Sequence, residues 1–184
     1  MNATETARIC DAISQIKPAQ RFDTETPAFW AVILGDIRYE DARQAVLNLG
    51  GRQQFIDPSD INQYMARGGY EGLGKALDLE PEAIIKELLD SGLGGRGGAN
   101  FPVGRKWDFL RNASADPRYL VCNADEGDPG AWVNRTLLEG DPHLIVEGML
   151  IAARASHAAA GYIYIRYEYP LAVQRMQAAV DHAY

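Results

Sequence analysis

The chain contains 184 residues, 47% of them hydrophobic, and it carries a formal net charge of −7 at pH 7. This hydrophobic fraction is close to that of ordinary globular proteins, so the chain can bury a core and is not expected to be disordered as a whole. The acidic balance argues against a general nucleic-acid-binding protein, because that function needs a basic surface to displace counterions.

Two further observations limit the class of protein. Cys10 and Cys122 are the two cysteines of the sequence, too few for a disulfide framework, and too few for a zinc site or an iron–sulfur cluster held by this chain alone. The sequence opens with no charged-then-apolar leader, and no apolar run reaches the roughly 18 residues that a transmembrane helix needs. We therefore expect a cytoplasmic protein with free thiols and no membrane contact.

The first ninety residues show the pattern of short helices. Residues 3–16 form an amphipathic segment, and residues 27–50 contain two apolar clusters around an acidic break, which predicts two helices there. Three helix-start signals follow, at residues 58–60, 68–69 and 80–81, the last with a proline at the first helical position.

From residue 119 onwards the pattern becomes that of an α/β unit. Residues 119–122 have the pattern of a buried strand, 142–160 that of a helix with a wide apolar face, 161–170 that of the clearest strand, and 171–184 that of the start of another helix. Strand, helix, strand and helix in this order predict parallel strands joined by a right-handed crossover. Two strands make an incomplete sheet, so we expect the fold to be unfinished within this sequence.

The segment SGLGGRGGANFPVGRKW, residues 91–107, holds six glycines in its first fourteen residues. Glycines let backbone N–H groups converge on a phosphate or on the flat edge of a cofactor. Five of them are expected to line such an approach: Gly94, Gly95, Gly97, Gly98 and Gly104. Arg96, Arg105 and Lys106 provide cations for an anion.

Neither of the two familiar phosphate-binding patterns is present in this segment. Trp107 follows Lys106 where G-x-x-x-x-G-K-[ST] needs serine or threonine, and Asn100 stands where G-x-G-x-x-G needs its last glycine. The residues alone therefore leave two interpretations open, a phosphate-binding loop and a flexible linker.

A second segment, NADEGDPGAWVNR, spans residues 123–135 and follows the first predicted strand at its carboxyl end, where α/β sheets usually bind ligands. Asp125, Glu126 and Asp128 place three carboxylates within four residues. They would repel phosphate but accept hydrogen bonds from ribose, from a ribityl chain or from the amide edge of an isoalloxazine. A solvated acidic turn and a site for a hard cation are the alternatives.

Taken together, the two segments closely resemble the NADH-binding flavoprotein subunit of respiratory complex I. They are more similar still to the diaphorase subunits of NAD(P)-linked hydrogenases and formate dehydrogenases. The match begins near residues 55–58, includes YMARGGYEGLGKAL, and covers about 130 residues to the C-terminus. It implies a Rossmann-like FMN-binding α/β unit, in which NADH stacks on the flavin and passes a hydride to it, after which electrons leave singly through iron–sulfur clusters.

The resemblance assigns a cofactor-binding role to three groups of residues. The group around the FMN phosphate and ring contains Gly95, Arg96, Gly97, Gly98 and Lys106. The group that hydrogen-bonds the ribityl chain and the isoalloxazine contains Asn123, Asp125 and Glu126. The group that flanks the nicotinamide nucleotide contains Phe101 and Phe109, with Glu126 and Asp128 as polar partners. No catalytic acid or base is implied, because hydride moves directly between the stacked rings.

Four positions depart from the family pattern. Gly94 stands where arginine is usual, Asn134 where many relatives have aspartate, and Tyr167 where a glycine is usual. Asn100 also replaces a glycine, and asparagine is the side chain that best tolerates a positive φ.

Family members also continue beyond this sequence. Their later parts include a second α/β domain, a further Gly-Glu-Glu stretch at the flavin and a helical bundle whose four cysteines hold a [4Fe–4S] cluster. The resemblance implies FMN and NAD as cofactors here, with the cluster in the part that this sequence lacks. The implied partner is an iron–sulfur subunit of an NADH dehydrogenase, hydrogenase or formate dehydrogenase complex.

Residues 1–60 do not share this resemblance. They are similar to a small helical domain of actinobacterial phage replication proteins of the helicase-loader type. We therefore divide the sequence into a helical segment, 1–54, a helical lead-in, 55–90, and a partial FMN/NAD-binding domain, 91–184. Two functions stay open: an FMN- and NAD(H)-binding part of a diaphorase subunit, and a non-catalytic interaction module or fusion joined near residues 55–62.

Overall fold

The computed structural model of the chain describes residues 30–32, 57–95, 99–128, 131 and 133–184. Within these ranges the sheet is parallel and has β2 in its centre, between β1 and β3. The strands are β1 (Trp30–Val32), β2 (Tyr119–Ala124) and β3 (Ala160–Ile165). The predicted α/β architecture with parallel strands is confirmed.

The strand β1 differs from the sequence prediction, which placed helices in residues 27–50. Trp30–Val32 instead pairs in parallel with the first three residues of β2. A strand on each side satisfies the backbone groups on both edges of β2, and this long-range pairing leaves no local sequence signal. The sheet of the described residues therefore has three strands rather than two. The rest of 27–50 and the predicted helix 3–16 lie outside the described residues.

The helices predicted within residues 58–90 are confirmed. They are α3 (Ile61–Met65), α4 (Glu71–Asp78) and α5 (Pro81–Asp90). The Asp60 side chain accepts the Asn62 N–H at 2.9 Å and so caps α3, while α4 follows the Gly68–Gly69 turn and α5 begins with its proline.

The remaining helices precede, connect and follow the two longer strands along the chain. The predicted helices α8 (Pro142–Ser156) and α9 (Pro170–Ala183) are confirmed, whereas α6 (Val103–Arg111) and α7 (Val133–Gly140) are additional to the prediction. Helix α6 buries Val103, Trp107 and Leu110 at helical spacing, between cationic and acidic residues that face outward.

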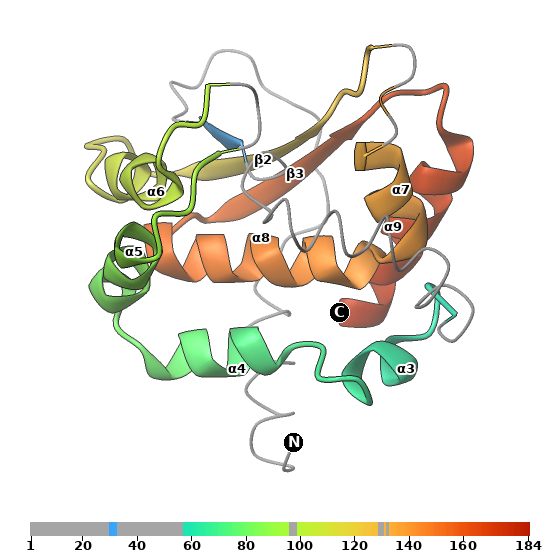
Figure 1. Cartoon of the computed structure of the whole chain (residues 1–184), viewed down its shortest axis with the longest axis horizontal. Coiled ribbons are helices and arrows are strands. Elements are labelled where there is room, and N and C mark those ends of the chain that lie inside the picture. Colours follow the sequence, from blue (N-terminus) through green and yellow to red (C-terminus); the bar gives the residue numbers. More distant parts are fainter. Residues whose placement is uncertain (1–29, 33–56, 96–98, 129–130, 132) are drawn as a thin grey trace.

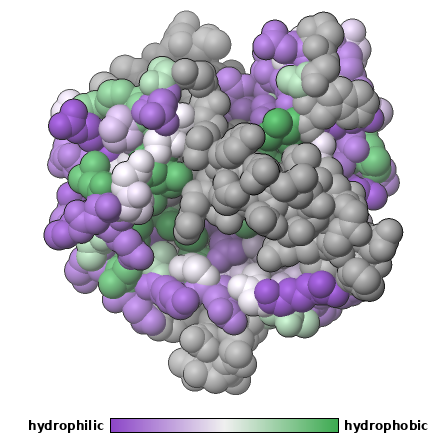
Figure 2. Space-filling model, viewed as in Figure 1, coloured by the Kyte–Doolittle hydropathy of each residue, from purple (hydrophilic) through white to green (hydrophobic). Residues whose placement is uncertain are grey.

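Figure 1 shows these elements in layers: the sheet lies above α8, and α3 and α4 lie below it. Helices α5 and α6 lie at one end of α8, and α7 and α9 lie at the other. One hydrophobic cluster draws on β2 and on every helix from α3 to α9. The described surface visible in Figure 2 is mainly hydrophilic, with apolar side chains in small groups.

The contact between α8 and α4 depends on a buried carboxylate. Glu147 of α8 is 8% exposed and accepts hydrogen bonds from the Tyr64 hydroxyl at 2.5 Å and from the backbone N–H groups of Tyr70 and Leu73 at 3.0 Å each. These N–H groups stand at the start of α4, where a helix has no internal acceptors for them. A negative charge is also favourable at this positive end of the helix dipole. Glu147 therefore caps α4 from another helix.

Two glycines make room for this carboxylate and for the tyrosine ring that donates to it. A Cβ placed on Gly69 would overlap with ring atoms of Tyr64, and a Cβ on Gly72 would lie 3.0 Å from Glu147 Oε1. Burial, together with the charge of Glu147, raises the pKa of the Tyr64 hydroxyl, which therefore stays protonated and donates. Gly69 and Gly72 of YMARGGYEGLGKAL thus serve the packing of α3 and α4 around Glu147 of α8.

Next to this carboxylate lies a buried histidine. His143 is 1% exposed, its Nδ1 lies 3.0 Å from the Tyr70 hydroxyl, and its ring stacks on that of His182 with 6.3 Å between centroids. Its Nε2 has no hydrogen-bond partner in the part of the chain that the structure describes. Burial and the neighbouring His182 lower the pKa of His143 to about 4, so the imidazole is neutral in the folded protein near pH 7.

Replacing the capping carboxylate is expected to destabilise the fold strongly. Glu147→Ala leaves a buried hydroxyl and two backbone N–H groups without their acceptor, at a cost of about 3–5 kcal/mol in the free energy of unfolding. Urea denaturation followed by circular dichroism measures this loss. Glu87→Ala, at an exposed position of α5, is the matched control and is expected to change stability by less than about 0.5 kcal/mol. Equal effects of the two substitutions would contradict the capping role.

Stability is also expected to fall as the pH drops from 6.5 towards 4. In this window the unfolded His143, with its ordinary pKa of 6.5, binds a proton that the folded protein, with a pKa of about 4, does not. The integrated loss is up to about 3 kcal/mol. Urea denaturation at a series of pH values checks it: His143→Gln should flatten the slope, whereas His157→Asn, at an exposed histidine, should remove less of it. Parallel curves for the unaltered chain and His143→Gln would exclude His143 as the source.

Candidate functional site

The described ends of the glycine-rich segment come together between α5 and α6. The Val103 N–H donates to the Leu93 carbonyl at 3.0 Å, and the Gly95 N–H donates to the Phe101 carbonyl at 2.7 Å. The segment therefore leaves and returns through a narrow base. Three of the predicted site residues lie outside the described residues: Arg96, Gly97 and Gly98.

Two positions of this segment show why their residues are needed. Asn100 has a φ of 49°, which confirms the expectation of a positive φ at this position. Gly104 lies in α6, and a Cβ there would be 2.7 Å from Cγ of Leu89 and 3.0 Å from the Ile85 carbonyl oxygen. The structure thus gives Gly104 a role in the close packing of α6 on α5, instead of the ligand approach expected from the sequence.

The predicted nicotinamide-flanking residues are neighbours, with Phe101 just before α6 and Phe109 within it. Phe101 is 40% exposed and Phe109 is 58% exposed, and their ring centroids are 6.1 Å apart. Large apolar side chains exposed in this way offer a face on which a flat ring can stack. Lys106 lies between them in sequence and is half-buried on the same helix.

The acidic segment begins where β2 ends. The Asn123 side-chain oxygen accepts the Asp125 N–H at 2.9 Å, and the Asp125 carbonyl accepts the Gly127 N–H at 3.1 Å. The side chains of Asn123, Asp125 and Asp128 are all exposed. Polar oxygens are therefore presented to solvent at the carboxyl end of the central strand, which is where the sequence places the ribityl-binding group.

Glu126 has a different environment from its neighbours. It is 7% exposed, and its carboxylate accepts the backbone N–H groups of Val133 at 2.7 Å and of Asn134 and Arg135 at 3.0 Å. These are the first N–H groups of α7, so Glu126 caps this helix in the way that Glu147 caps α4. Contact of Glu126 with a cofactor stays a prediction, and a carboxylate has about four lone-pair sites, which leaves room for a further donor.

Two residues that the sequence analysis missed, both just after β3, hold the acidic segment in place. The Tyr169 hydroxyl and Nη1 of Arg166 donate to the Glu126 carbonyl at 3.0 and 3.4 Å. Arg166 Nε also lies 3.7 Å from Oδ1 of Asp125. The order of the elements could have pointed to these residues. Because β2 and β3 are neighbouring parallel strands whose ends, Ala124 and Ile165, lie opposite each other, residues that follow the two strands are brought together.

Arg166 is itself paired with Glu168, at 2.7 Å between Nη2 and Oε1. The hydrogen bonds of this pair raise the pKa of Arg166 and lower the pKa of Glu168, so both groups stay charged. The guanidinium therefore stands between carboxylates of two neighbouring strand ends and partly neutralises Asp125.

Other candidate ligands of the described residues do not form a metal site. Within the described ranges no group of three or more His, Cys, Asp or Glu side chains is arranged to hold a metal ion. Cys122 is buried in β2, which raises the pKa of its thiol to about 12. No helix in the described ranges is long and apolar enough to cross a membrane.

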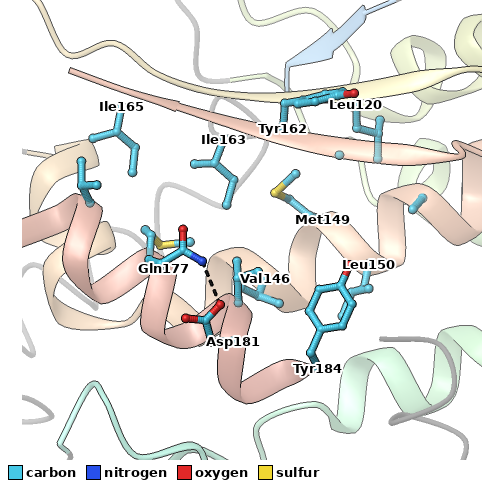
Figure 3. Close-up of a pocket in the computed structure, with 15 residues that line it drawn as sticks. Leu120, Val146, Met149, Leu150, Tyr162, Ile163, Ile165, Gln177, Asp181 and Tyr184 are labelled. Carbon is cyan, nitrogen blue, oxygen red and sulfur yellow. Dashed lines mark hydrogen bonds between the residues drawn. The ribbon is translucent and has the colours of Figure 1, made fainter. Parts of the chain in front are cut away.

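A groove of about 660 Å³ lies between β3, α8 and α9 (Figure 3). Its walls are mostly apolar, with Met149, Ile163 and Ile165 among them, and its polar edge includes Gln177, whose amide donates to Asp181 at 2.8 Å. None of the described residues predicted to bind FMN or NAD lines this groove. The groove and these described candidates are therefore separate features.

Comparison with known proteins assigns the family. The model of the Nuo51 FMN-binding domain matches residues 88–184, more than half of the chain. The chain therefore belongs to the Nuo51 FMN-binding domain family.

Individual relatives agree with this assignment. The NADP-reducing hydrogenase subunit HndC of Solidesulfovibrio fructosivorans is 51% identical over 129 residues, which cover 70% of this chain and 26% of that protein. One NADH-quinone oxidoreductase subunit, from Escherichia coli, is 46% identical over 128 residues, which cover 68% of this chain and 29% of that protein. This chain thus spans less than a third of the length of these curated relatives.

Solved structures of an NAD⁺-reducing [NiFe]-hydrogenase are similar in fold. The structure of its H₂-reduced state matches with a TM-score of 0.53 and 44% identity, over 56% of this chain and 18% of that one. The structure of its air-oxidized state matches with a TM-score of 0.59 and 27% identity, over 96% of this chain and 37% of that one.

Removal of the Glu126 carboxylate is expected to destabilise the start of α7. Glu126→Ala leaves three N–H groups without an acceptor and should lower the free energy of unfolding by about 2–4 kcal/mol. Hydrogen exchange should show faster exchange at residues 133–135, whereas Asp128→Ala, an exposed carboxylate of the same segment, should leave them unchanged. Unaltered protection in Glu126→Ala would show that the cap is not needed.

Proposed function

We propose that the chain is the FMN- and NAD(H)-binding part of an NADH dehydrogenase or diaphorase subunit. The observation that supports this most directly is the position of Asn123 and Asp125. Their exposed oxygens stand at the carboxyl end of β2, in a region that matches the model of an FMN-binding domain. In sheets of this kind, that edge is where ligands bind.

The chemistry of the described residues fits a flavin mononucleotide. Asn123 and Asp125 offer acceptors to ribityl hydroxyls, and Arg105 and Lys106 of α6 offer cations to a phosphate. Bound FMN would supply the redox chemistry, by taking a hydride from NADH and passing electrons on one at a time. Hydride transfer needs closely stacked rings, so the contribution of the protein is orientation.

The roles of the individual residues follow from this proposal. Gly95, together with Arg96, Gly97 and Gly98, borders the FMN phosphate and ring. The exposed pair of Phe101 and Phe109 flanks the nicotinamide, with Glu126 and Asp128 as its polar partners. Arg166 and Tyr169 act as positioning residues, because they hold the backbone of the acidic segment without being assigned to the cofactor.

We also propose the setting in which this part acts. Two of the relatives described above are named as subunits, which supports an iron–sulfur subunit of an NADH dehydrogenase, hydrogenase or formate dehydrogenase complex as the partner. The [4Fe–4S] cluster belongs to a part of the family outside these residues.

The proposed location is the cytoplasm, without membrane contact. The net charge of −7 supports a role without nucleic acid. Residues 1–54, 55–90 and 91–184 are proposed as the three units of the chain.

A visible absorption spectrum of the purified chain, recorded before and after addition of FMN and then of NADH, tests this function. We expect FMN to bind and its absorption band to bleach on addition of NADH. Asp125→Ala should weaken FMN binding about 10-fold or more, because a hydrogen bond to a charged group is worth about 1.5–3 kcal/mol. Asp90→Ala removes an exposed carboxylate of α5 and is the control expected to bind FMN like the unaltered chain. A folded chain that takes up no FMN would refute the proposal and leave the interaction module as the hypothesis to pursue.

A further inference from the structure

At the base of the glycine-rich segment, two residues interlock. A Cβ placed on Gly94 would overlap with Oδ1 of Asn100 and lie 2.8 Å from its Cγ. The Asn100 amide thus occupies the space that a side chain at position 94 would take. Gly94 also forms an isolated antiparallel bridge with Pro102, so this contact sits where the two arms of the segment meet.

The backbone of Asn100 supports the same interpretation. Its φ of 49° lies in the left-handed region, which glycine visits freely and asparagine tolerates better than other side chains do. An asparagine has fewer backbone states than a glycine, and it adds an amide that fills the space over Gly94. One position supplies the side chain and the other supplies the room for it.

We propose that Asn100 is a positioning residue of the cofactor site, which closes the base of the glycine-rich segment over Gly94 and thereby sets the affinity for FMN. This inference rests on the proposed function, because Gly95 is assigned to FMN there. Gly95 is buried, and its N–H donates to the carbonyl of Phe101. A base that is ordered before binding reduces the entropy lost when a ligand binds.

The contact between Asn100 and Gly94 is separate from the hydrophobic core. Asn100 is exposed, whereas the buried residues of α6 belong to the cluster shared with other helices. Gly104 differs in this respect, because a Cβ there would meet backbone and side-chain atoms of α5. Loss of the Asn100 side chain is therefore expected to change the order of the segment more than the global stability.

A double-mutant cycle on the full chain tests this proposal, with FMN alone as the probe. Gly94→Ala should push the exposed Asn100 amide aside, and should therefore weaken FMN binding about 10-fold, shift the thermal midpoint by less than about 2 °C and speed hydrogen exchange of the Gly95 amide. Asn100→Gly should weaken FMN binding about 10-fold, shift the midpoint by less than about 2 °C, and speed hydrogen exchange of the Gly95 amide. In the double variant the added alanine should cost little beyond Asn100→Gly. Gly74→Ala is the matched control, because a Cβ there meets nothing within 4 Å.

The outcomes separate the steps of the proposal. Additive effects of the two substitutions, or a Gly94→Ala variant that behaves like Gly74→Ala, would overturn the interlock. Unchanged FMN affinity and Gly95 exchange in Asn100→Gly would overturn the positioning role. If the unaltered chain binds no FMN, the proposed function and the claim on affinity both fail, while hydrogen exchange of the Gly95 amide, measured without FMN, still decides whether positions 94 and 100 interlock.

Discussion

The buried carboxylate of Glu147 is the interaction on which the arrangement of the helices depends. It lies in the middle of α8 and binds a hydroxyl from α3 and two N–H groups at the start of α4. Helix α8 in turn lies under the sheet (Figure 1), so one carboxylate connects the helices that precede the glycine-rich segment with the strand that leads to the acidic one. A buried charge is stable only with all its partners in place, and this requirement selects one placement of α3 and α4.

The same physical principle orders the candidate site. Glu126 follows β2, and its carboxylate caps the start of α7. Its carbonyl oxygen accepts hydrogen bonds from Arg166 and Tyr169, which follow β3. The exposed oxygens of Asn123 and Asp125 therefore stand on a backbone that is held from two sides. A binding site that presents its side chains from an ordered frame loses less entropy when a ligand binds.

The sequence predicted the α/β class and the two longer strands, and it predicted five of the described helices, three of them with their start signals. It also singled out both segments of the candidate site. What it missed has physical reasons. The strand β1 is stabilised by its pairing with β2, which lies far away in the sequence. Helices α6 and α7 begin next to glycine, proline and acidic residues, which are typical of loops. Glu126 caps N–H groups that lie seven to nine residues away in the sequence, and Glu147 caps N–H groups more than seventy residues away. No local sequence pattern predicts hydrogen bonds over such separations.

Residue types and their spacing thus determined the chemistry that this chain can offer: a glycine-rich segment with cations, a cluster of carboxylates and exposed aromatic rings. Only the tertiary structure decided which of these groups face solvent and which serve the fold. In the folded chain Glu126 caps a helix and Gly104 lies in a contact between helices. Asp125 is exposed, and the Asn100 amide lies over Gly94. The reason is that a polar group within the protein takes the partner that folding brings to it, and sequence neighbours alone do not specify that partner.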